Sequence, residues 1–206
     1  MSFYERVVLP RFLNCACGTK PIMKQREKVV PRAEGTVLEI GIGTGLNLPY
    51  YDPAKIERVI GLDPSEDAWR MAGDKAKDLP FDVEFIGLPG EEIPLDENSV
   101  DTVLVTYSLC TIPDPVAALK GMARVLRPGG QLVFCEHGEA PDEGVRRWQA
   151  RVNPLWSKLA GGCNLNRPIP SLLGQGGFEL AGLEQMYLPS TPRIAGYNYW
   201  GSAAPG

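Results

Sequence analysis

The stretch that decides the fold is EIGIGTG, which runs from Glu39 to Gly45. It ends the apolar run TVLEI at 36–40, which is typical of a buried strand, and we expect a helix to follow it. Glycines at alternate positions permit a tight turn and let the backbone approach a ligand closely. The sequence therefore predicts a ligand site at the end of the first strand of an α/β domain.

Short apolar runs alternate with helical patterns after this loop, as expected for a parallel sheet with crossover helices. Further strands are predicted at 59–62, 83–86, 101–106 and 131–135, with helices from about Pro64 and over 114–126. Beyond Pro141 we expect a helix over 142–159, interrupted near Pro154, and a short helix after Pro170. Two antiparallel strands within 178–187 and 194–200 are predicted to close the edge of the sheet.

Size, charge and the N-terminal sequence exclude several classes of protein. A chain of 206 residues fits a single domain whose core buries roughly 70% of the unfolded surface. The net charge is −4 and the basic residues are dispersed, so no nucleic-acid partner is expected. Charges occupy the first residues, and no apolar run approaches the roughly 18 residues of a membrane span. We therefore expect a cytoplasmic protein without integral membrane association.

The cysteine pattern predicts free thiols and no metal site. The chain has five cysteines and one histidine, and an odd number of cysteines without an export signal argues against a disulfide framework. The first two form C-x-C, which is not the C-x-x-C pair of redox or zinc sites. The cysteines are Cys15, Cys17, Cys110, Cys135 and Cys163.

The glycine spacing and two acidic residues indicate which nucleotide the loop binds. A dinucleotide fold uses G-x-G-x-x-G, but here the third glycine is Gly45 and Leu46 stands in its place. Glu39 would repel a pyrophosphate at this turn and would attract an ammonium group. Asp63, about 20 residues after the loop, is placed to accept both ribose hydroxyls. These features predict a nucleoside ligand with a cationic tail.

Three motifs resemble those of the class I S-adenosylmethionine-dependent methyltransferases. They are E-x-G-x-G-x-G at 39–45, GLD at 61–63 and RVLRPGG at 124–130, and the resemblance covers about Val30 to His137. It implies S-adenosylmethionine as the cofactor and a doubly wound, mostly parallel seven-stranded sheet, with helices on both faces and an antiparallel C-terminal edge hairpin. This Rossmann-like methyltransferase fold would form one domain over 1–206, with a lid segment at 1–30, a cofactor-binding core at 36–137 and acceptor-side elements at 141–206. In the lid segment Tyr4 or Gln25 would reach the cofactor, and the charged run at 24–28 is expected to be a solvated helix face.

The resemblance also implies which residues contact the cofactor. The methionine part would lie along the glycine loop, the ribose at the end of the second strand, the adenine against the loop at 90–93, and the transferable methyl beside 106–110. The candidate cofactor residues are Glu39, Gly41, Gly43, Gly45, Asn47, Asp63, Pro64, Gly90, Glu91, Thr106, Tyr107 and Cys110.

Three shorter segments point to the methyl acceptor. LCTI at 109–112, EH at 136–137 and GCNLNR at 162–167 resemble segments of animal enzymes that methylate alkyl thiols and hydrogen sulfide, and of their bacterial relatives. The resemblance implies a small thiol acceptor. His137 follows the fifth strand and is the candidate catalytic base, although a structural role for it is equally compatible with the sequence.

Other functions remain open at this point. A hydroxyl or carbon nucleophile on a quinone or natural product would require a base, and His137 would then be essential. A nicotinamide-dependent oxidoreductase would use the same glycine turn, although Leu46 and Glu39 argue against it. A binding module that holds the cofactor without transferring its methyl group is also compatible with the motifs.

Overall fold

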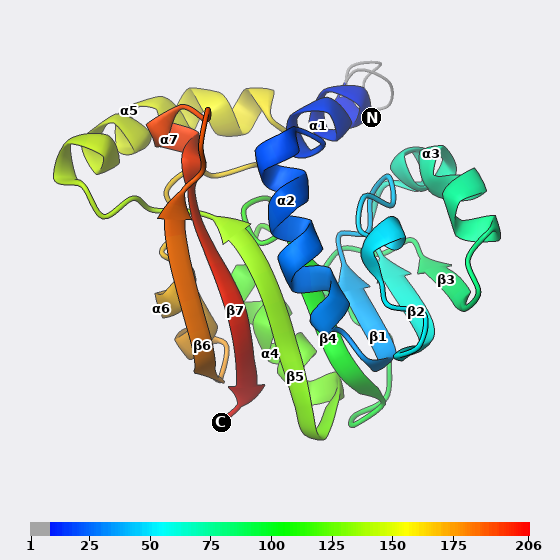
Figure 1. The fold of residues 1–206 in the computed structure, drawn as a ribbon. Coiled ribbons are helices and arrows are strands. Elements are labelled where there is room, and N and C mark those ends of the chain that lie inside the picture. The colour runs from blue at the N-terminus through cyan, green and yellow to red at the C-terminus, as the bar shows by residue number, and fades with distance from the viewer. Residues whose placement is uncertain (1–8) are drawn as a thin grey trace.

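The computed structural model describes residues 9–206 and contains one seven-stranded sheet of order β3-β2-β1-β4-β5-β7-β6 (Figure 1). The first five strands pair in parallel, and β7 pairs antiparallel with both β5 and β6. The predicted fold class, including the antiparallel C-terminal edge, is confirmed. The strands are β1 (Gly35–Ile40), β2 (Ile56–Leu62), β3 (Asp82–Ile86), β4 (Val100–Thr106), β5 (Leu126–His137), β6 (Phe178–Tyr187) and β7 (Tyr197–Pro205).

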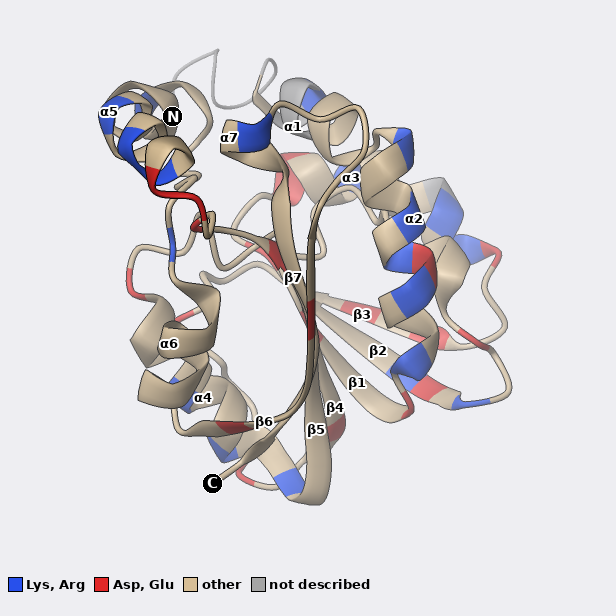
Figure 2. Ribbon diagram, turned by 60° about the vertical axis from the view of Figure 1, so that its left-hand side comes forward, with Lys and Arg blue, Asp and Glu red and all other residues tan. Residues whose placement is uncertain are grey.

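Helices cover both faces of the sheet. Figure 2 shows α4 and α6 on one side of the strands and α2 on the other. The helices are α1 (Leu9–Cys17), α2 (Lys20–Val29), α3 (Glu66–Lys77), α4 (Pro115–Val125), α5 (Glu143–Leu159), α6 (Ile169–Gln175) and α7 (Arg193–Gly196), with short 3-10 helices η2 (Val30–Arg32) and η3 (Leu48–Tyr50). Ser65 and Asp114 cap α3 and α4 by accepting hydrogen bonds from backbone N–H groups.

The alternation of side chains along β1 decides which face each residue serves. Leu38 and Ile40 belong to the core beneath α4 and α6, whereas Val37 packs in the core beneath α2. Because successive side chains point to opposite faces of a sheet, Glu39 lies on the α2 face. The helix that covers this face therefore also covers the acidic residue of the glycine motif.

Three local predictions were wrong. The glycine loop leads to the three-residue η3 and not to a longer helix, because Pro49 and Pro53 interrupt the segment before β2. Helix α5 continues through Pro154, which is exposed, so that water can satisfy the carbonyl freed by the missing N–H. The last strand begins at Tyr197 and not at Ile194, which lies in α7.

Across residues 9–206, every helix is too short or too polar to cross a membrane.

Candidate active site

Two glycines of the loop after β1 have distinct roles, and both have positive φ angles, of 75° for Gly41 and 48° for Gly43. A Cβ on Gly41 would lie 2.1 Å from the Ser108 hydroxyl oxygen, so this glycine lets the loop touch the end of β4. Among the residues that the structure describes, a Cβ on Gly43 would meet nothing nearer than an Asp63 oxygen at 3.8 Å. The described residues therefore leave space at Gly43 in which a ligand can approach.

Asp63 ties the glycine loop to the start of α3. One carboxylate oxygen accepts from the Gly43 N–H at 3.0 Å, and the other accepts from the Ser65 N–H at 2.8 Å. Burial raises the pKa of Asp63 above its usual value, and the two backbone bonds partly offset this effect. Each oxygen keeps a lone pair for a further donor such as a hydroxyl. Pro64 beside it is exposed, and Gly45 packs against Leu48.

Glu39 is fully buried within a polar network. Its carboxylate accepts from the Asn47 amide at 2.9 Å and from the Tyr51 hydroxyl at 2.6 Å. The Asn47 amide also donates to the Thr106 hydroxyl at 2.9 Å. Burial raises the pKa of Glu39 to about 7, against the lowering effect of these bonds and of Arg26. The Glu39 carboxyl therefore titrates near neutral pH in the free protein.

Arg26 is a candidate site residue that sequence reasoning missed. It extends from α2 into the same network, where one guanidinium nitrogen donates to Asn47 Oδ1 and to Thr106 Oγ1, each at 2.6 Å. Its Nε is buried and has no hydrogen-bond partner among the described residues. The run Lys24–Lys28 looked like a solvated helix face, but Gln25, Arg26 and Val29 point inward. These three residues stand at positions i, i+1 and i+4 of a helix, and this spacing was the sequence signal that they share one buried face.

The N-terminal helices lie over the glycine loop. The Thr44 hydroxyl donates to Asn14 of α1 at 2.6 Å, and the Lys28 ammonium lies 4.8 Å from the centre of the Trp200 ring. Gln25, which we expected to reach the cofactor, instead donates to the Met186 sulfur. Tyr4, the other residue expected to do so, lies outside the described residues.

The ends of β4 and β5 are held together by buried hydrogen bonds. Tyr107 has a positive φ of 54°, and its hydroxyl donates to Asn198 Oδ1 of β7 at 2.6 Å. Glu136 accepts from the N–H groups of Ser108 and Leu109 at 2.7 and 3.0 Å. Burial raises the pKa of Glu136 to about 7, although these two bonds act in the opposite direction. The segment after β4 is thereby fixed against the segment that carries His137.

His137 contacts a cysteine that lies far from it in the sequence. Its Nε2 is 3.3 Å from the Cys163 sulfur, and its ring stacks on Tyr107 with centroids 6.4 Å apart. Burial alone would lower the pKa of His137, but hydrogen bonding and charge at Cys163 outweigh it and raise the pKa. The pKa of Cys163 is lowered, first by hydrogen bonding with Cys110 and then by His137. The pair thus favours a thiolate beside an imidazolium.

Cys110 completes this group of side chains. The ligand atoms of Cys110, His137 and Cys163 all lie within 4.8 Å of one another. Hydrogen bonding with Cys163 and then burial raise the pKa of the Cys110 thiol. Asn164 fastens the two cysteine segments together, because its N–H and its side-chain amide donate to the Cys110 carbonyl at 2.9 and 3.0 Å.

The candidate adenine loop packs against the segment after β4. A Cβ on Gly90 would lie 2.9 Å from the Ile112 side chain, so a larger residue would push the two loops apart. Glu91 accepts from the Asp114 N–H at 3.1 Å and so supports the start of α4. Contact of these residues with an adenine stays a prediction.

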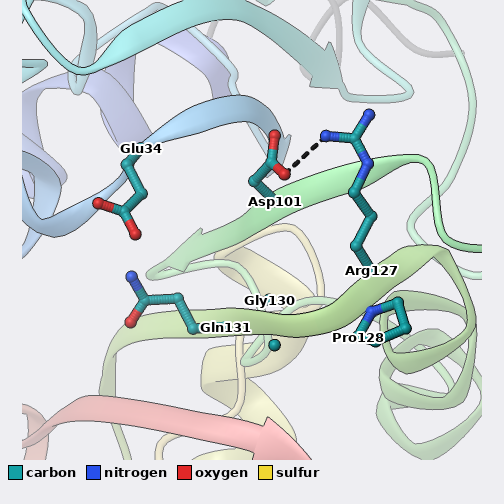
Figure 3. Close-up of a pocket in the computed structure, with 7 residues that line it drawn as sticks. Glu34, Asp101, Arg127, Pro128, Gly130 and Gln131 are labelled. Atoms are coloured by element: carbon teal, nitrogen blue, oxygen red, sulfur yellow. Dashed lines mark hydrogen bonds and ion pairs between the residues drawn. The ribbon is translucent and has the colours of Figure 1, made fainter.

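A surface depression of about 420 Å³ lies at the opposite edge of the sheet, at the amino ends of β1, β4 and β5 (Figure 3). Asp101 there accepts from Arg127 at 2.6 Å and from the Thr36 N–H at 2.8 Å. Ligands of open α/β sheets bind at the carboxyl ends of the strands. The hydrogen bonds of Asp101 therefore join the amino ends of these strands, and the depression is distinct from the candidate site.

Comparison with known proteins identifies the class. The sequence model of a protein family described as a methyltransferase domain matches residues 38–134. The chain is 34% identical over 169 residues to human thiol S-methyltransferase TMT1B, a match that covers 78% of this chain and 68% of the relative. The chain belongs to the class I S-adenosylmethionine-dependent methyltransferases.

Within that class, the similarity to thiol S-methyltransferases is not limited to one protein. Human thiol S-methyltransferase TMT1A is 32% identical over 177 residues, which is 81% of this chain and 71% of the relative. A geranyl diphosphate methyltransferase solved with S-adenosylmethionine has the same fold, with a TM-score of 0.69, 14% identity and coverage of 89% of this chain and 84% of that chain.

Proposed function

We propose that this methyltransferase transfers the methyl group of S-adenosylmethionine to a small thiol. The observation that carries the proposal is the contact of His137, at the end of β5, with Cys163 at 3.3 Å, together with Cys110 in the segment after β4. This group favours negative charge on sulfur, which is the chemistry that a thiol acceptor needs. The similarity to two human thiol S-methyltransferases supports the same acceptor class.

The cofactor's two charged groups fit the two ends of the network on the α2 face. The carboxylate of Glu39 matches the ammonium of S-adenosylmethionine, and the unpartnered Nε of Arg26 matches its carboxylate. Asp63 would accept from the ribose hydroxyls, as proposed from the sequence. Gly41, Gly43, Asn47 and the segment from Thr106 to Cys110 would form the wall beside the methionine part.

The reaction requires alignment more than acid–base chemistry. The cofactor supplies a sulfonium methyl group that a nucleophile displaces in line. The protein's residues hold the acceptor sulfur behind that methyl group, and such positioning supplies most of the acceleration. His137 would accept or orient the acceptor's proton, while α1 and α2 would act as a lid that excludes water.

Binding of S-adenosylhomocysteine is expected to strengthen as the pH rises from about 6 to about 8. Glu39, whose pKa is about 7 in the free protein because of burial, must lose its proton to bind the ligand's ammonium group. At pH 6 to 7, binding should therefore release a proton from Glu39. Calorimetry in buffers of different ionisation enthalpy measures this release. Glu39→Gln should remove it, and unchanged proton release in Glu39→Gln would assign it to another group.

Arg26→Ala is expected to weaken S-adenosylhomocysteine binding by about 10- to 100-fold, because one charged hydrogen bond contributes about 1.5–3 kcal/mol. Arg26→Lys should bind with intermediate affinity, since lysine keeps the charge without the guanidinium fork. Lys24→Ala on the exposed side of the same helix is the matched control. Equal affinities for Arg26→Ala and Lys24→Ala, measured by calorimetry, would show that α2 only covers the site.

The proposed function is tested by methyl transfer from radiolabelled S-adenosylmethionine to panels of alkyl thiols, phenols, quinols and amines. Turnover confined to thiols is the expected result. Turnover of a quinol or phenol would favour the hydroxyl or carbon acceptor considered above, and cofactor binding without transfer to any panel would favour a binding module. Enhanced NADH fluorescence on addition of the protein would revive the nicotinamide alternative.

A further inference from the structure

We infer that Cys110, His137 and Cys163 form a site for one borderline-soft divalent metal ion of the Zn²⁺ class, with a fourth coordination position that takes the sulfur of the acceptor. The inference deepens the proposed function and rests on it for the nature of that fourth ligand. No such site was expected from the sequence, because the three residues come from separate segments and none belongs to a C-x-x-C pair.

The donor set and its spacing fit such an ion. The three ligand atoms lie within 4.8 Å of one another, and the Cys163 sulfur is 3.3 Å from His137 Nε2. Zinc bonds of about 2.3 Å to sulfur and about 2.0 Å to nitrogen place tetrahedral ligands roughly 3.5–3.8 Å apart. Small side-chain adjustments would therefore bring all three atoms to bonding distance. Two thiolates and one imidazole are also a known ligand set of catalytic zinc sites, which leave one position open.

The fold holds the three ligands in place, and the contact of a ligand atom with the backbone is limited to the long hydrogen bond of 3.6 Å that the Cys110 thiol donates to the Tyr107 carbonyl, among the described residues. Asn164 fixes the Cys110 segment through the Cys110 carbonyl, and stacking on Tyr107 orients the His137 ring. The other ring nitrogen, His137 Nδ1, is buried without a hydrogen-bond partner in the described part of the chain. Neither ring nitrogen is therefore committed to a carbonyl or carboxylate of the fold. The other three described cysteines differ, since the Cys135 thiol donates to the Tyr107 hydroxyl, Cys15 is exposed, and the half-buried Cys17 is not among the three ligand atoms that cluster within 4.8 Å.

The location gives the ion a use in methyl transfer. Ser108 touches Gly41 of the cofactor loop, and Cys110 follows two residues later. Two thiolates neutralise a divalent ion, so a third, incoming thiolate keeps its negative charge and its nucleophilicity. With the ion bound, His137 would act as a ligand in place of the proton-accepting role described above, and the acceptor would need no separate base.

The step balances without an oxidant or reductant. An acceptor R–SH loses its proton to solvent as its sulfur binds the ion. That sulfur forms a bond to the methyl carbon, while the bond between the methyl carbon and the cofactor sulfur breaks and its electron pair stays on the cofactor sulfur. The product R–S–CH₃ is an uncharged thioether, a weak ligand for zinc, and it leaves the open position.

The test uses the full chain, purified and reduced with a phosphine so that no competing thiol is present. Titration with Co²⁺ should load about one ion per chain and produce thiolate-to-cobalt charge-transfer absorption. Cys163→Ser, Cys110→Ser and His137→Ala should each weaken loading at least about tenfold. Cys15→Ser, which changes an exposed thiol, should bind as the parent does.

A second titration examines the fourth position. Adding an alkyl thiol to the cobalt-loaded protein should shift the absorption, whereas the corresponding alcohol should not. Failure to bind Co²⁺ or Zn²⁺, or loading that survives all three substitutions, overturns the inference, as does a spectrum that thiols leave unchanged. Because the spectra need no methyl transfer, thiol turnover without metal binding would reject the metal site and leave the proposed function standing.

Discussion

Asp63→Ala is expected to lower the affinity for S-adenosylhomocysteine at least about 100-fold. In the proposed complex the carboxylate accepts from both ribose hydroxyls, and two hydrogen bonds to a charged group contribute about 3–6 kcal/mol. The substitution also removes the acceptor for the Gly43 and Ser65 N–H groups, which shape the loop that binds the cofactor. Calorimetric titration measures the affinity directly.

Asp101→Asn is the matched control for this change. Asp101 also accepts a backbone N–H bond and is held by an arginine, but it lies at the amino ends of the strands. Its replacement should destabilise the fold modestly without changing cofactor affinity. Thermal denaturation of both variants without ligand measures their loss of stability, and so separates it from any loss of affinity. Asp63→Ala binding within about threefold of the parent would contradict the ribose assignment, since a charged hydrogen bond of that size cannot be lost unnoticed.

His137→Ala is expected to reduce kcat for thiol methylation by about 100-fold or more, within the range observed for acid–base and positioning groups. The affinity for S-adenosylhomocysteine should stay within about twofold of the parent, because the ring makes no hydrogen bond to Glu39 or Arg26, and the hydrogen bond from the Tyr107 hydroxyl to Asn198 still holds the tyrosine on which the ring stacks. Steady-state kinetics with one thiol, together with calorimetry, would show the loss in kcat without a loss in cofactor binding.

Gln131→Ala, nearer the amino end of β5, is the control for a general disturbance of the strand, since the Gln131 side chain bonds only to the Arg32 carbonyl among the described groups. It should leave kcat unchanged. If His137→Ala retained nearly full activity, His137 would have a structural role, and the acceptor thiol would be activated without it. A parallel loss of cofactor affinity would instead indicate that the substitution deforms the end of β5.

The sequence predicted the sheet well because buried parallel strands are nearly continuous apolar runs bounded by turn residues. The carboxyl ends of the five parallel strands were therefore correct to within two residues, and with them the positions of Glu39, Asp63 and His137. The start of β5 and the end of β7 were each placed five residues away from where the structure has them. The helix after the glycine loop was wrong because two prolines outweighed the usual pattern of this fold. Helix α5 continues through Pro154 because that position is exposed and water can bond to the carbonyl that lacks its N–H partner. The spacing of apolar residues in the sequence does not show this exposure.

The site was less accessible from sequence than the fold. Arg26 lies in a charged run, and only its packing against the sheet shows that its guanidinium is buried. The contact between His137 and Cys163 joins residues 26 positions apart on different elements, and no local motif encodes it. Cys110 was expected to line the cofactor, which stays a prediction, and the structure also places its sulfur within 4.8 Å of the ligand atoms of His137 and Cys163. Such a group forms where segments that are far apart in the sequence meet in the fold, so only the three-dimensional structure shows it.

The position of β7 has a consequence for the order in which the molecule can form during synthesis. The ribosome delivers β6 before β7, yet β6 has no partner until β7 has emerged and inserted itself beside β5. The parallel strands that carry the cofactor loops precede both and can assemble first. Asn198 of β7 then accepts the hydrogen bond from the Tyr107 hydroxyl and so fixes the ring on which His137 stacks. A nascent chain could thus recognise its cofactor before it is able to use it.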